Sequence, residues 1–503
     1  MNQGIITRRD FIGYTAKATG AFLALPYLSA CGSLTDVTTG STLVNDMHSQ
    51  LNSTRVNMIL KPTSTEELAR IVAQASAQGR TLSLAGKRHA MGGQQFGTDT
   101  DLIDMTSLNK IISLDKHNGI LEVESGVTWP PIIDYCWNEQ KNDAKPWSII
   151  QKQTGAEELT LGGALAANAH GRGLNMQPMI QDVESFKLIT PIGEQLECSR
   201  SSNPELFKLV IGGYGLFGVI SSIKLRIMPR TRLKRTVKIM NIDELIPAFE
   251  QRIKQGYMYG DFQYMTDSTS PDFLIKGVFS CYLPVDASEK ETEIKHRELA
   301  VDDWKKLYRM AFADKSGAYN AYSQYYLSTN DQLYWSDTHQ RSVFLNDYHI
   351  TLNRELGFKD PASLMITEIY VPRKQLTNFM NYVKKVALKD NLDIIYGTIR
   401  LIKKDRESFL AWAKEDYVCI IFNLRVFHTP EGIEKAKRDF RSLIDAGLHY
   451  GGSYYLTYHR WARKDQVLAC YPQFPDFLRM KRKHDPKGVI QSDWYRHYRE
   501  MFA

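Results

Sequence analysis

The sequence predicts an α+β protein built from two domains. Its 503 residues are 43% hydrophobic, which is enough apolar material for two full cores. Helix-like and strand-like patterns alternate as far as a clear strand at 220–227, after which the chain becomes rich in Tyr, Phe and Trp. We therefore expect a first domain over 54–230, a second over 231–446, and a C-terminal segment, 447–503, that returns to the first.

The first domain is expected to begin with a helix and a strand. Ser64 and Glu67 have the spacing of a capping box, and apolar residues follow at helical intervals over 68–75. Gly79 indicates the end of this helix, because glycine readily adopts the left-handed conformation of a helix C-cap. Residues 81–85 then form the next expected strand.

Turn residues separate the elements that follow. The sequence His117-Asn118-Gly119 predicts a hairpin between strands at 111–114 and 120–124. Two prolines at 130 and 131 indicate the start of a helix, and a further helix is expected near Pro204. In the second domain, strand-like segments lie at 364–371 and 394–402.

Two loops rich in small residues stand out in the first domain. The first follows the strand that ends at Ala85 and has a histidine at its centre; it runs over residues 82–94. The second runs over residues 160–171 and contains Gly162, Gly163 and Gly171. Small residues let the backbone approach a large flat or phosphorylated ligand, whose phosphates can be bound by free backbone N–H groups.

The two loops in this order resemble the PCMH-type FAD-binding domain of the vanillyl-alcohol oxidase superfamily. The branch they resemble most is the sugar-lactone and alditol oxidases. The resemblance runs over about 57–230 and returns with 452–459 and 485–488. It implies a two-domain PCMH-type fold with an α+β substrate cap domain over FAD. The residues it places at the cofactor are Gly86, Lys87, Arg88, His89, Ala90, Met91, Gly92, Gly93, Gln94, Ser125, Gly126, Thr154, Thr160, Gly162, Gly163, Ala167, Asn168, His170, Gly171, Gly218, Val219 and Ile220.

The resemblance also implies a covalent bond between His89 and the flavin. In that family the histidine of the first loop often binds the 8α-methyl group, and Arg88-His89-Ala90 falls where sugar-alcohol oxidases carry Arg-His-Ser. The alternative is a loop histidine that only donates or accepts hydrogen bonds. A second, cysteinyl link is not expected, since no cysteine lies between Cys136 and Cys198.

Residues 213–218 fit the pattern G-x-G-x-x-G, but we do not interpret them as a dinucleotide fingerprint. That fingerprint needs a strand before it and a helix after it. Here an expected helix comes first and a β-branched strand follows. FAD is therefore a better ligand for this turn than NAD.

Candidate catalytic residues lie in the cap and the C-terminal segment. Related sugar-alcohol oxidases carry Glu-x-Arg on a cap strand; here Arg400 is retained and Thr398 replaces the glutamate. Relatives also carry a lysine where this chain has Tyr458, three residues after Tyr455 and just before His459. Oxidation of an alcohol needs a group that takes or orients the hydroxyl proton, and these side chains are the candidates. The alternatives are a surface arginine and core tyrosines. Arg172 is expected to pair with a phosphate or an acidic side chain.

The N-terminus has the pattern of an export signal. Arg8-Arg9 precede a weakly apolar run at 16–28, which favours a twin-arginine signal. Leu28-Ser29-Ala30-Cys31 resembles a lipoprotein cleavage box, which would leave Cys31 lipidated in the membrane; ordinary cleavage nearby is the alternative. The signal, 1–31, would be followed by a polar flexible tether over 32–53. These features predict a periplasmic protein exported by the twin-arginine machinery.

Charge and cysteine content exclude other classes. The net charge of +7 includes +2 from the signal, so the rest carries no nucleic-acid signature. The basic run at 479–483 is expected to be the solvated face of a helix, with a membrane-surface role as the alternative. Cysteine spacing predicts neither a disulfide framework nor a metal site, so the thiols other than Cys31 are expected in the core.

The sequence therefore predicts a FAD-dependent oxidoreductase that removes a hydride from a CH–OH carbon of a polyol, sugar or aldonolactone. Reduced flavin would pass its electrons to oxygen or to a membrane acceptor. Two alternatives stay open: an enzyme acting on a lipid-linked sugar or a sterol-like substrate, and a flavin-binding electron carrier without turnover.

Overall fold

The helix and the strand predicted after Ser64 are both present, and the strand lies at one edge of the first sheet. The computed structural model describes residues 38–503, apart from 156, 290–296, 344 and 346–347. The Ser64 side chain accepts a hydrogen bond from the backbone N–H of Glu67, and Gly79 ends α1 (Thr65–Gln78) at a φ of 66°. The sheet has the order β1-β2-β4-β3. Its strands are β1 (Thr38–Val44), β2 (Thr54–Leu60), β3 (Leu82–Ala85) and β4 (Asp101–Asp104).

A second sheet carries the predicted hairpin, and with the first it makes up the N-terminal domain. Its order is β5-β6-β10-β8-β9, and β7 pairs with the end of β10. The strands are β5 (Ile111–Asp115), β6 (Ile120–Glu124), β7 (Trp147–Ile149), β8 (Val183–Ile189), β9 (Gln195–Ser199) and β10 (Val219–Pro229). The helices are α2 (Trp129–Glu139), α3 (Leu161–Ala167) and α4 (Pro204–Val210), with the short η1 (Met105–Ser107) and η2 (Met179–Asp182).

The turn at 213–218 lies between α4 and β10, as the sequence predicted. A helix precedes it and a strand follows it, which is the reverse of a dinucleotide fingerprint.

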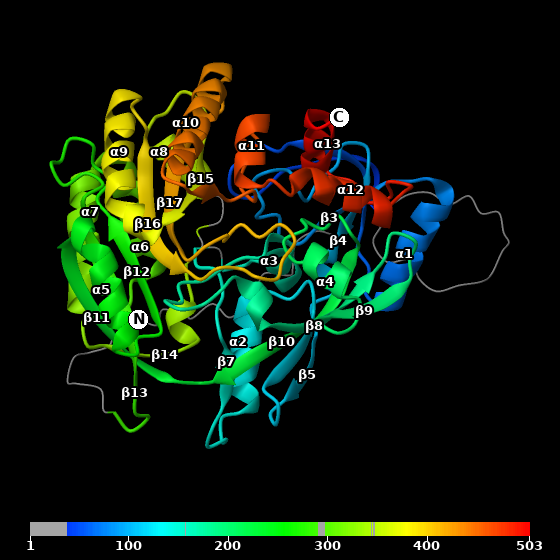
Figure 1. The fold of residues 1–503 in the computed structure, drawn as a ribbon, viewed down its shortest axis with the longest axis horizontal. Coiled ribbons are helices and arrows are strands. Elements are labelled where there is room, and N and C mark those ends of the chain that lie inside the picture. Colours follow the sequence, from blue (N-terminus) through cyan, green and yellow to red (C-terminus); the bar gives the residue numbers. More distant parts are fainter. Residues whose placement is uncertain (1–37, 156, 290–296, 344, 346–347) are drawn as a thin grey trace, which may run out of the picture. The chain divides into compact units, whose positions relative to one another are not determined.

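The second domain is one antiparallel sheet covered by helices (Figure 1). Its order is β14-β11-β13-β12-β16-β17-β15-β18. The strands are β11 (Arg232–Asn241), β12 (Tyr259–Tyr264), β13 (Lys276–Val285), β14 (Leu333–Trp335), β15 (Ala362–Pro372), β16 (Ile394–Ile402), β17 (Tyr417–Phe427) and β18 (Ser453–Tyr454). The helices are α5 (Ile242–Lys254), α6 (Val301–Ala313), α7 (Lys315–Ser328), α8 (Tyr348–Glu355), α9 (Leu376–Lys389) and α10 (Pro430–His449), with η3 (Thr338–Gln340) and η4 (Arg373–Gln375). The α+β class is confirmed.

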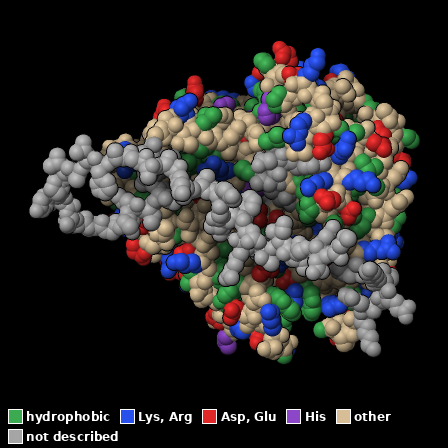
Figure 2. Space-filling view, turned by 180° about the vertical axis from the view of Figure 1, so that it is seen from behind, with side chains coloured by type: hydrophobic (Ala, Val, Ile, Leu, Met, Phe, Trp, Pro, Cys, Tyr) green, Lys and Arg blue, Asp and Glu red, His purple; other side chains and the backbone are tan. Residues whose placement is uncertain are grey.

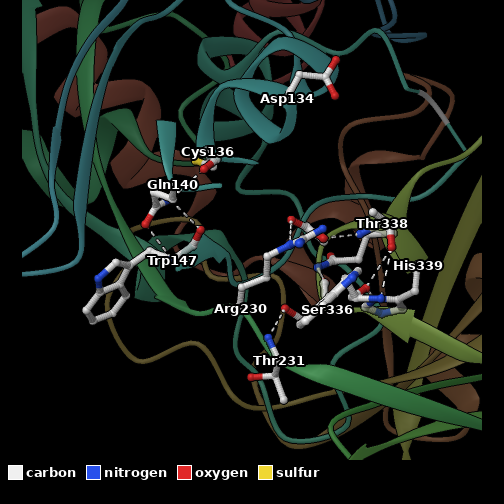
Figure 3. A network of polar contacts seen from close by, with 12 residues as sticks. Asp134, Cys136, Gln140, Trp147, Arg230, Thr231, Ser336, Thr338 and His339 are labelled. Atoms are coloured by element: carbon white, nitrogen blue, oxygen red, sulfur yellow. Dashed lines mark hydrogen bonds and ion pairs between the residues drawn. The ribbon is translucent and has the colours of Figure 1, made fainter. Parts of the chain in front are cut away.

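The predicted boundary near residue 230 coincides with a buried junction between the domains. Arg230 Nε lies 2.8 Å from Asp337 Oδ2, and its guanidinium lies 4.3 Å and 4.4 Å from the ring centroids of Trp137 and Trp335. Thr231 N donates to Ser336 Oγ at 3.1 Å, and Figure 3 shows Arg230, Thr231 and Ser336 close together. Residues just after β10 are thereby fixed against the loop that leads from β14 into η3.

The C-terminal segment first extends the cap sheet through β18 and then returns to the first sheet. α11 (Lys464–Cys470), α12 (Phe474–His484) and α13 (Asp493–Met501) follow β18, and Figure 1 shows α12 and α13 beside β3 and β4. Leu82 N donates to Val489 O at 2.7 Å, and Thr98 N donates to Asp493 Oδ1 at 2.9 Å. The end of the chain therefore braces the strand and loop that carry His89.

Two expectations are wrong. Residues 38–53 are not a flexible tether: β1 pairs with β2, and buried Asp46 accepts backbone hydrogen bonds from Ser49 and Gln50. The polar residues that resembled a linker instead form hydrogen bonds with one another inside a turn. In the basic run, Lys481 is not solvated; it is buried and bound to Asp485, four residues later on α12.

Other expectations concern the surface and the chain ends. The five cysteines of the described residues are buried and free, which confirms core thiols. Figure 2 shows acidic and basic side chains interspersed on the face it views. Among the described residues, no helix has the length and apolar character needed to cross a membrane. The predicted export signal and lipidation site lie outside the described residues.

Candidate active site

A cavity of about 1190 Å³ lies where both glycine loops face the cap sheet. Its walls come from the loop after β3, the start of α3, the turn before β10, and one face of strands β12, β16, β17 and β15. Most of the predicted cofactor residues line it. Five do not, namely Gly92, Gly93, Gly126, Asn168 and Gly171.

The five residues outside the cavity shape the loops around it. Asn168 ends α3 at a φ of 50°, and its side chain binds Asp405 and the backbone N–H of Ile180. A Cβ on Gly126 would lie 1.9 Å from Met105 O, so that glycine is required by packing. These residues hold the loops in place instead of contacting a ligand in the cavity.

The two glycine loops pack directly against each other. A Cβ on Gly86 would lie 2.2 Å from Thr160 Oγ1, and one on Gly162 would lie 2.8 Å from the Cβ of Ser125. Gly162 N also donates to Ser125 O at 2.8 Å. Only glycine permits this approach, which brings the loops from two distant segments to one wall.

His89 lines the cavity and is 9% exposed. Its Nδ1 lies 3.0 Å from Nε2 of His48. Burial, with smaller contributions from His48 and Lys87, lowers the pKa of His89 to about 3, although Asp46 opposes the shift. The imidazole is therefore neutral at physiological pH, which is the form that can act as a nucleophile.

The opposite wall is a row of side chains across three strands of the cap. Ile421 of β17 pairs with Thr398 of β16 on one side and with Glu368 of β15 on the other. Paired residues project from the same face of a sheet, so these three face the cavity together. Arg400, two residues after Thr398, lies on the same face and also lines the cavity.

Glu368 is the centre of a buried polar chain that the sequence did not reveal. Its Oε1 lies 2.7 Å from His170 Nε2, and its Oε2 accepts a hydrogen bond from the Tyr458 hydroxyl at 3.1 Å. Burial alone would raise the pKa of Glu368, but His170, Arg400 and Tyr458 outweigh burial and hold that pKa below its usual value. The carboxylate is ionised and ready to accept a proton.

The polar side chains beside Glu368 have unused hydrogen-bonding capacity. Arg400 binds Thr154 through one terminal nitrogen, while its Nε is buried with no partner among the described residues. Thr398 Oγ1 is likewise buried and unpartnered within the described structure. Buried polar atoms without partners are rare and costly, so these atoms mark where a polar ligand atom fits.

Three of the four predicted catalytic residues line the cavity, and one does not. Arg400, Tyr455 and Tyr458 line the cavity. The Tyr455 hydroxyl is engaged with Ala167 O at 2.6 Å, so Tyr455 fixes the second glycine loop. The prediction of His459 as a catalytic residue is wrong. His459 does not line the cavity, and its ring packs on Trp461 and Phe440. Successive residues point to different sides there, which separates His459 from Tyr458.

Arg172 and the cluster of His170, Glu368 and Cys419 are two further polar features near the cavity. Arg172 pairs with buried Asp261 at 3.3 Å, the acidic alternative of the two that the sequence left open. His170, Glu368 and Cys419 have ligand atoms within 4.8 Å of one another, the spacing of a metal site. However, burial raises the pKa of the Cys419 thiol well above its usual value, which disfavours the thiolate that a metal requires. The His170–Glu368 hydrogen bond accounts for the cluster.

The residues present fit FAD. The glycine loops form a cradle that a Cβ would fill at Gly86 and Gly162, and Lys87 and Arg88 add positive charge beside it. Ser125 Oγ is buried in that cradle without a partner among the described residues. A backbone cradle with cations suits a phosphate group, and the cavity is large enough to continue towards the cap.

Comparison with known proteins agrees with this geometry. Residues 56–199 match the protein family described as FAD binding domain. The chain is 24% identical to cytokinin dehydrogenase 2 of Arabidopsis thaliana over 86% of its own length and 87% of that protein. It is 25% identical to L-gulonolactone oxidase of Bos taurus over 40% of the chain and 43% of the relative. It is 28% identical to L-gulono-1,4-lactone dehydrogenase of Mycobacterium tuberculosis over 35% of the chain and 39% of the relative.

The fold, the cavity and the family match define the class: a flavoprotein oxidoreductase with a PCMH-type FAD-binding domain. Within that class the chain is similar to sugar-lactone oxidases and dehydrogenases at low identity. The chain spans less than half of the lactone-oxidising relatives it matches, so their substrates are not assigned to it by likeness.

Proposed function

We propose that this protein oxidises a CH–OH group of a polyol, sugar or aldonolactone with FAD as the hydride acceptor. The observation that carries the proposal is the buried Glu368 carboxylate, bound to His170 and Tyr458, in the same cavity as both glycine loops. A carboxylate held ionised beside a tyrosine hydroxyl is suited to take the proton that an alcohol loses.

The side chains divide the work between orientation and proton transfer. Arg400 and Thr398 offer buried donors to the substrate oxygen. The substrate hydroxyl gives its proton to Glu368, which the Tyr458 hydroxyl orients, and the C–H hydrogen leaves as hydride, so the alcohol becomes a carbonyl. A bound flavin supplies the acceptor for that hydride. His170 holds the Glu368 carboxylate in position from the side of the glycine loop.

The relatives support an oxidoreductase and leave the donor open. Two of them are named for gulonolactone, which carries the proposed CH–OH group, but a match over 86% of the chain is to a cytokinin dehydrogenase. The test is anaerobic bleaching of the purified yellow protein by a panel of polyols, sugars and aldonolactones. Bleaching by at least one member supports the proposal. Bleaching only by lipid-linked sugars or sterols would favour the first alternative, and no bleaching at all would favour an electron carrier.

The cofactor is proposed to be bound covalently through His89. The neutral, buried imidazole at the cavity wall supports this, since an attacking nitrogen must be unprotonated. Protein precipitated with acid should stay yellow. Full release of the flavin into the supernatant would contradict the covalent bond while leaving FAD binding intact.

Export and anchoring are proposed from the N-terminal residues alone. Arg8-Arg9 and the box that ends at Cys31 favour a lipidated periplasmic protein, which could pass electrons to oxygen or to a membrane acceptor. Cys31→Ser should move the protein from the membrane fraction to the soluble periplasm. Replacing Arg8 and Arg9 with lysine should retain it in the cytoplasm. If both variants fractionate like the wild type, the targeting proposal is wrong.

A further inference from the structure

We propose that the substrate carries a flat apolar ring on the alcohol that is oxidised, and that the far end of the cavity binds this ring. The proposal rests on the proposed function, whose site is the near end of the same cavity. The far end, here called the aromatic vestibule, is lined by Trp304, Leu307, Tyr319, Tyr322, Tyr326 and Tyr334.

The vestibule is built by two helices that turn one face to the cavity. On α6, the lining residues Trp304, Leu307 and Ala311 are spaced by three and four, which is one helical stripe. On α7, Ala318, Tyr319, Tyr322 and Tyr326 repeat the pattern. α6 has no fully buried residue, although Trp304 and Leu307 are half-buried. Its apolar stripe therefore faces the open space of the cavity and is not sealed inside the core.

The rings of the vestibule form a surface suited to another ring. Tyr322 and Tyr326 have ring centroids 4.3 Å apart at 31°, and Tyr325 meets Tyr326 edge-on at 84°. The edge-on arrangement is one that aromatic groups prefer, and the tilted pair is in close contact. A flat ring would extend this packing. The hydroxyls of Tyr319 and Tyr322 are buried with no partner among the described residues, so they can also accommodate a polar atom at the edge of that ring.

The positive charge of Arg235, at the vestibule, is already engaged by neighbouring side chains. Arg235 lies 4.8 Å from the Tyr326 ring centroid and 4.7 Å from that of Tyr334, so its faces are covered. Its nitrogens donate to the Tyr282 hydroxyl and to Thr329 Oγ1. The buried guanidinium therefore stiffens the aromatic wall and does not present a free cation to an anionic substrate.

The distance between the two ends of the cavity exceeds the size of a single sugar ring. Arg235 lies on β11 and Arg400 on β16, with β13 and β12 between them. At about 4.8 Å per strand, this places the two backbones roughly 14 Å apart. A single lactone ring would fill only the near end, while an alcohol linked to an aromatic ring would reach from Arg400 into the vestibule.

The test uses a series in which only the apolar group grows. The ligands are the methyl, phenyl and naphthyl monoethers of glycerol, which share one vicinal diol. Binding to the flavin-loaded protein is measured by calorimetry, so turnover is not needed. We expect the phenyl ether to bind about ten-fold more tightly than the methyl ether, and the naphthyl ether more tightly still, because each ring buries more apolar area. Equal affinities across the series, or binding by none of the ethers, would overturn the proposal.

Variants of α7 localise the effect. Tyr322→Ala should remove most of the preference for the phenyl and naphthyl ethers while leaving the methyl ether unchanged, and Tyr322→Phe should retain the preference. Leu327→Ala is the matched control, since Leu327 is exposed on the same helix and does not line the cavity. A similar loss in both Tyr322→Ala and Leu327→Ala would overturn the assignment to the vestibule. If ring-bearing ethers bind as expected but no alcohol bleaches the flavin, the vestibule stands and the proposed oxidation fails.

Discussion

The two walls of the cavity are built in different ways. The flavin side consists mostly of backbone and small residues from two short loops, and a Cβ at Gly86 or Gly162 would collide with the neighbouring loop. The cap side consists of large polar side chains from three strands, joined by register through Ile421. The first wall depends on local sequence and the second on sheet pairing, so a single substitution should affect the two walls differently.

That difference predicts separable losses. Substitutions on the cap wall should slow chemistry while flavin stays bound, because the wall contributes side chains and no part of the glycine cradle. Substitutions on the flavin wall should change how the cofactor is held, with a smaller effect on the rate of hydride transfer.

The largest effect is expected for Glu368→Gln. The amide keeps the volume of the carboxyl group but cannot accept the substrate proton, so the rate of flavin reduction should fall by about 10²- to 10⁴-fold. Stopped-flow reduction under anaerobic conditions measures this rate, with flavin content as a check on folding. Glu407→Gln, at an exposed ion pair with Arg200, is the control and should behave like the wild type. Wild-type reduction in Glu368→Gln would exclude it as the proton acceptor.

Arg400→Ala should come next. A guanidinium beside the reacting oxygen stabilises charge that develops only in the transition state, and loss of one such donor costs about 2.7–4 kcal/mol, or about 10²- to 10³-fold in rate. Arg400→Lys should recover only part of this, since an ammonium lacks the planar fork. Arg226→Ala, at an exposed ion pair with Glu184, serves as the control. Normal reduction in Arg400→Ala would place Arg400 outside the reacting site.

Much of the fold was predictable because its signals are local. The N-cap at Ser64 and the hairpin at 117–119 each formed where the sequence placed them. The strand expected at 394–402 has those bounds in β16. Each of these signals is a short-range pattern of turn residues, caps or β-branched runs, and each is decided within a few residues of chain.

The cap wall could not be predicted from the sequence. The replacement of a glutamate by Thr398 suggested that a carboxylate was missing, yet Glu368 occupies the same row two strands away. Thr398 and Glu368 come together only because the strands are ordered β16-β17-β15, and no local sequence pattern predicts strand order. A charged residue inside the apolar run 364–371 was the available signal, since buried carboxylates are rare without a partner.

Tyr458→Phe should have a moderate effect with a characteristic pH dependence. Loss of its hydrogen bond to the Glu368 carboxylate should slow reduction about ten-fold, the value of one bond to a charged group at about 1.5 kcal/mol. The Tyr458 bond helps to hold the pKa of Glu368 below its usual value, so removing it raises that pKa. Glu368 supports activity above its folded pKa and loses it as the pH falls through that value. The acid limb of the rate profile should therefore move to higher pH; an unmoved limb would contradict a role for Glu368 as the base.

The smallest effect on rate is expected for His89→Ala, on the flavin wall. The glycine cradle, Ser125 and the cations of the first loop remain, so FAD should still bind and hydride transfer should fall by no more than about ten-fold. The change should appear in attachment: acid precipitation should release all the flavin from His89→Ala and none from the wild type. His48→Ala is an informative companion, since its Nε2 lies 3.0 Å from His89 Nδ1 and its ring helps to lower the pKa of His89. Without His48 the pKa of His89 should rise, so acidification should protonate the imidazole at a higher pH than in the wild type. A His89→Ala protein that reduces as slowly as Glu368→Gln would show that the two walls are not separable, and that the cradle alone does not position the flavin against the cap.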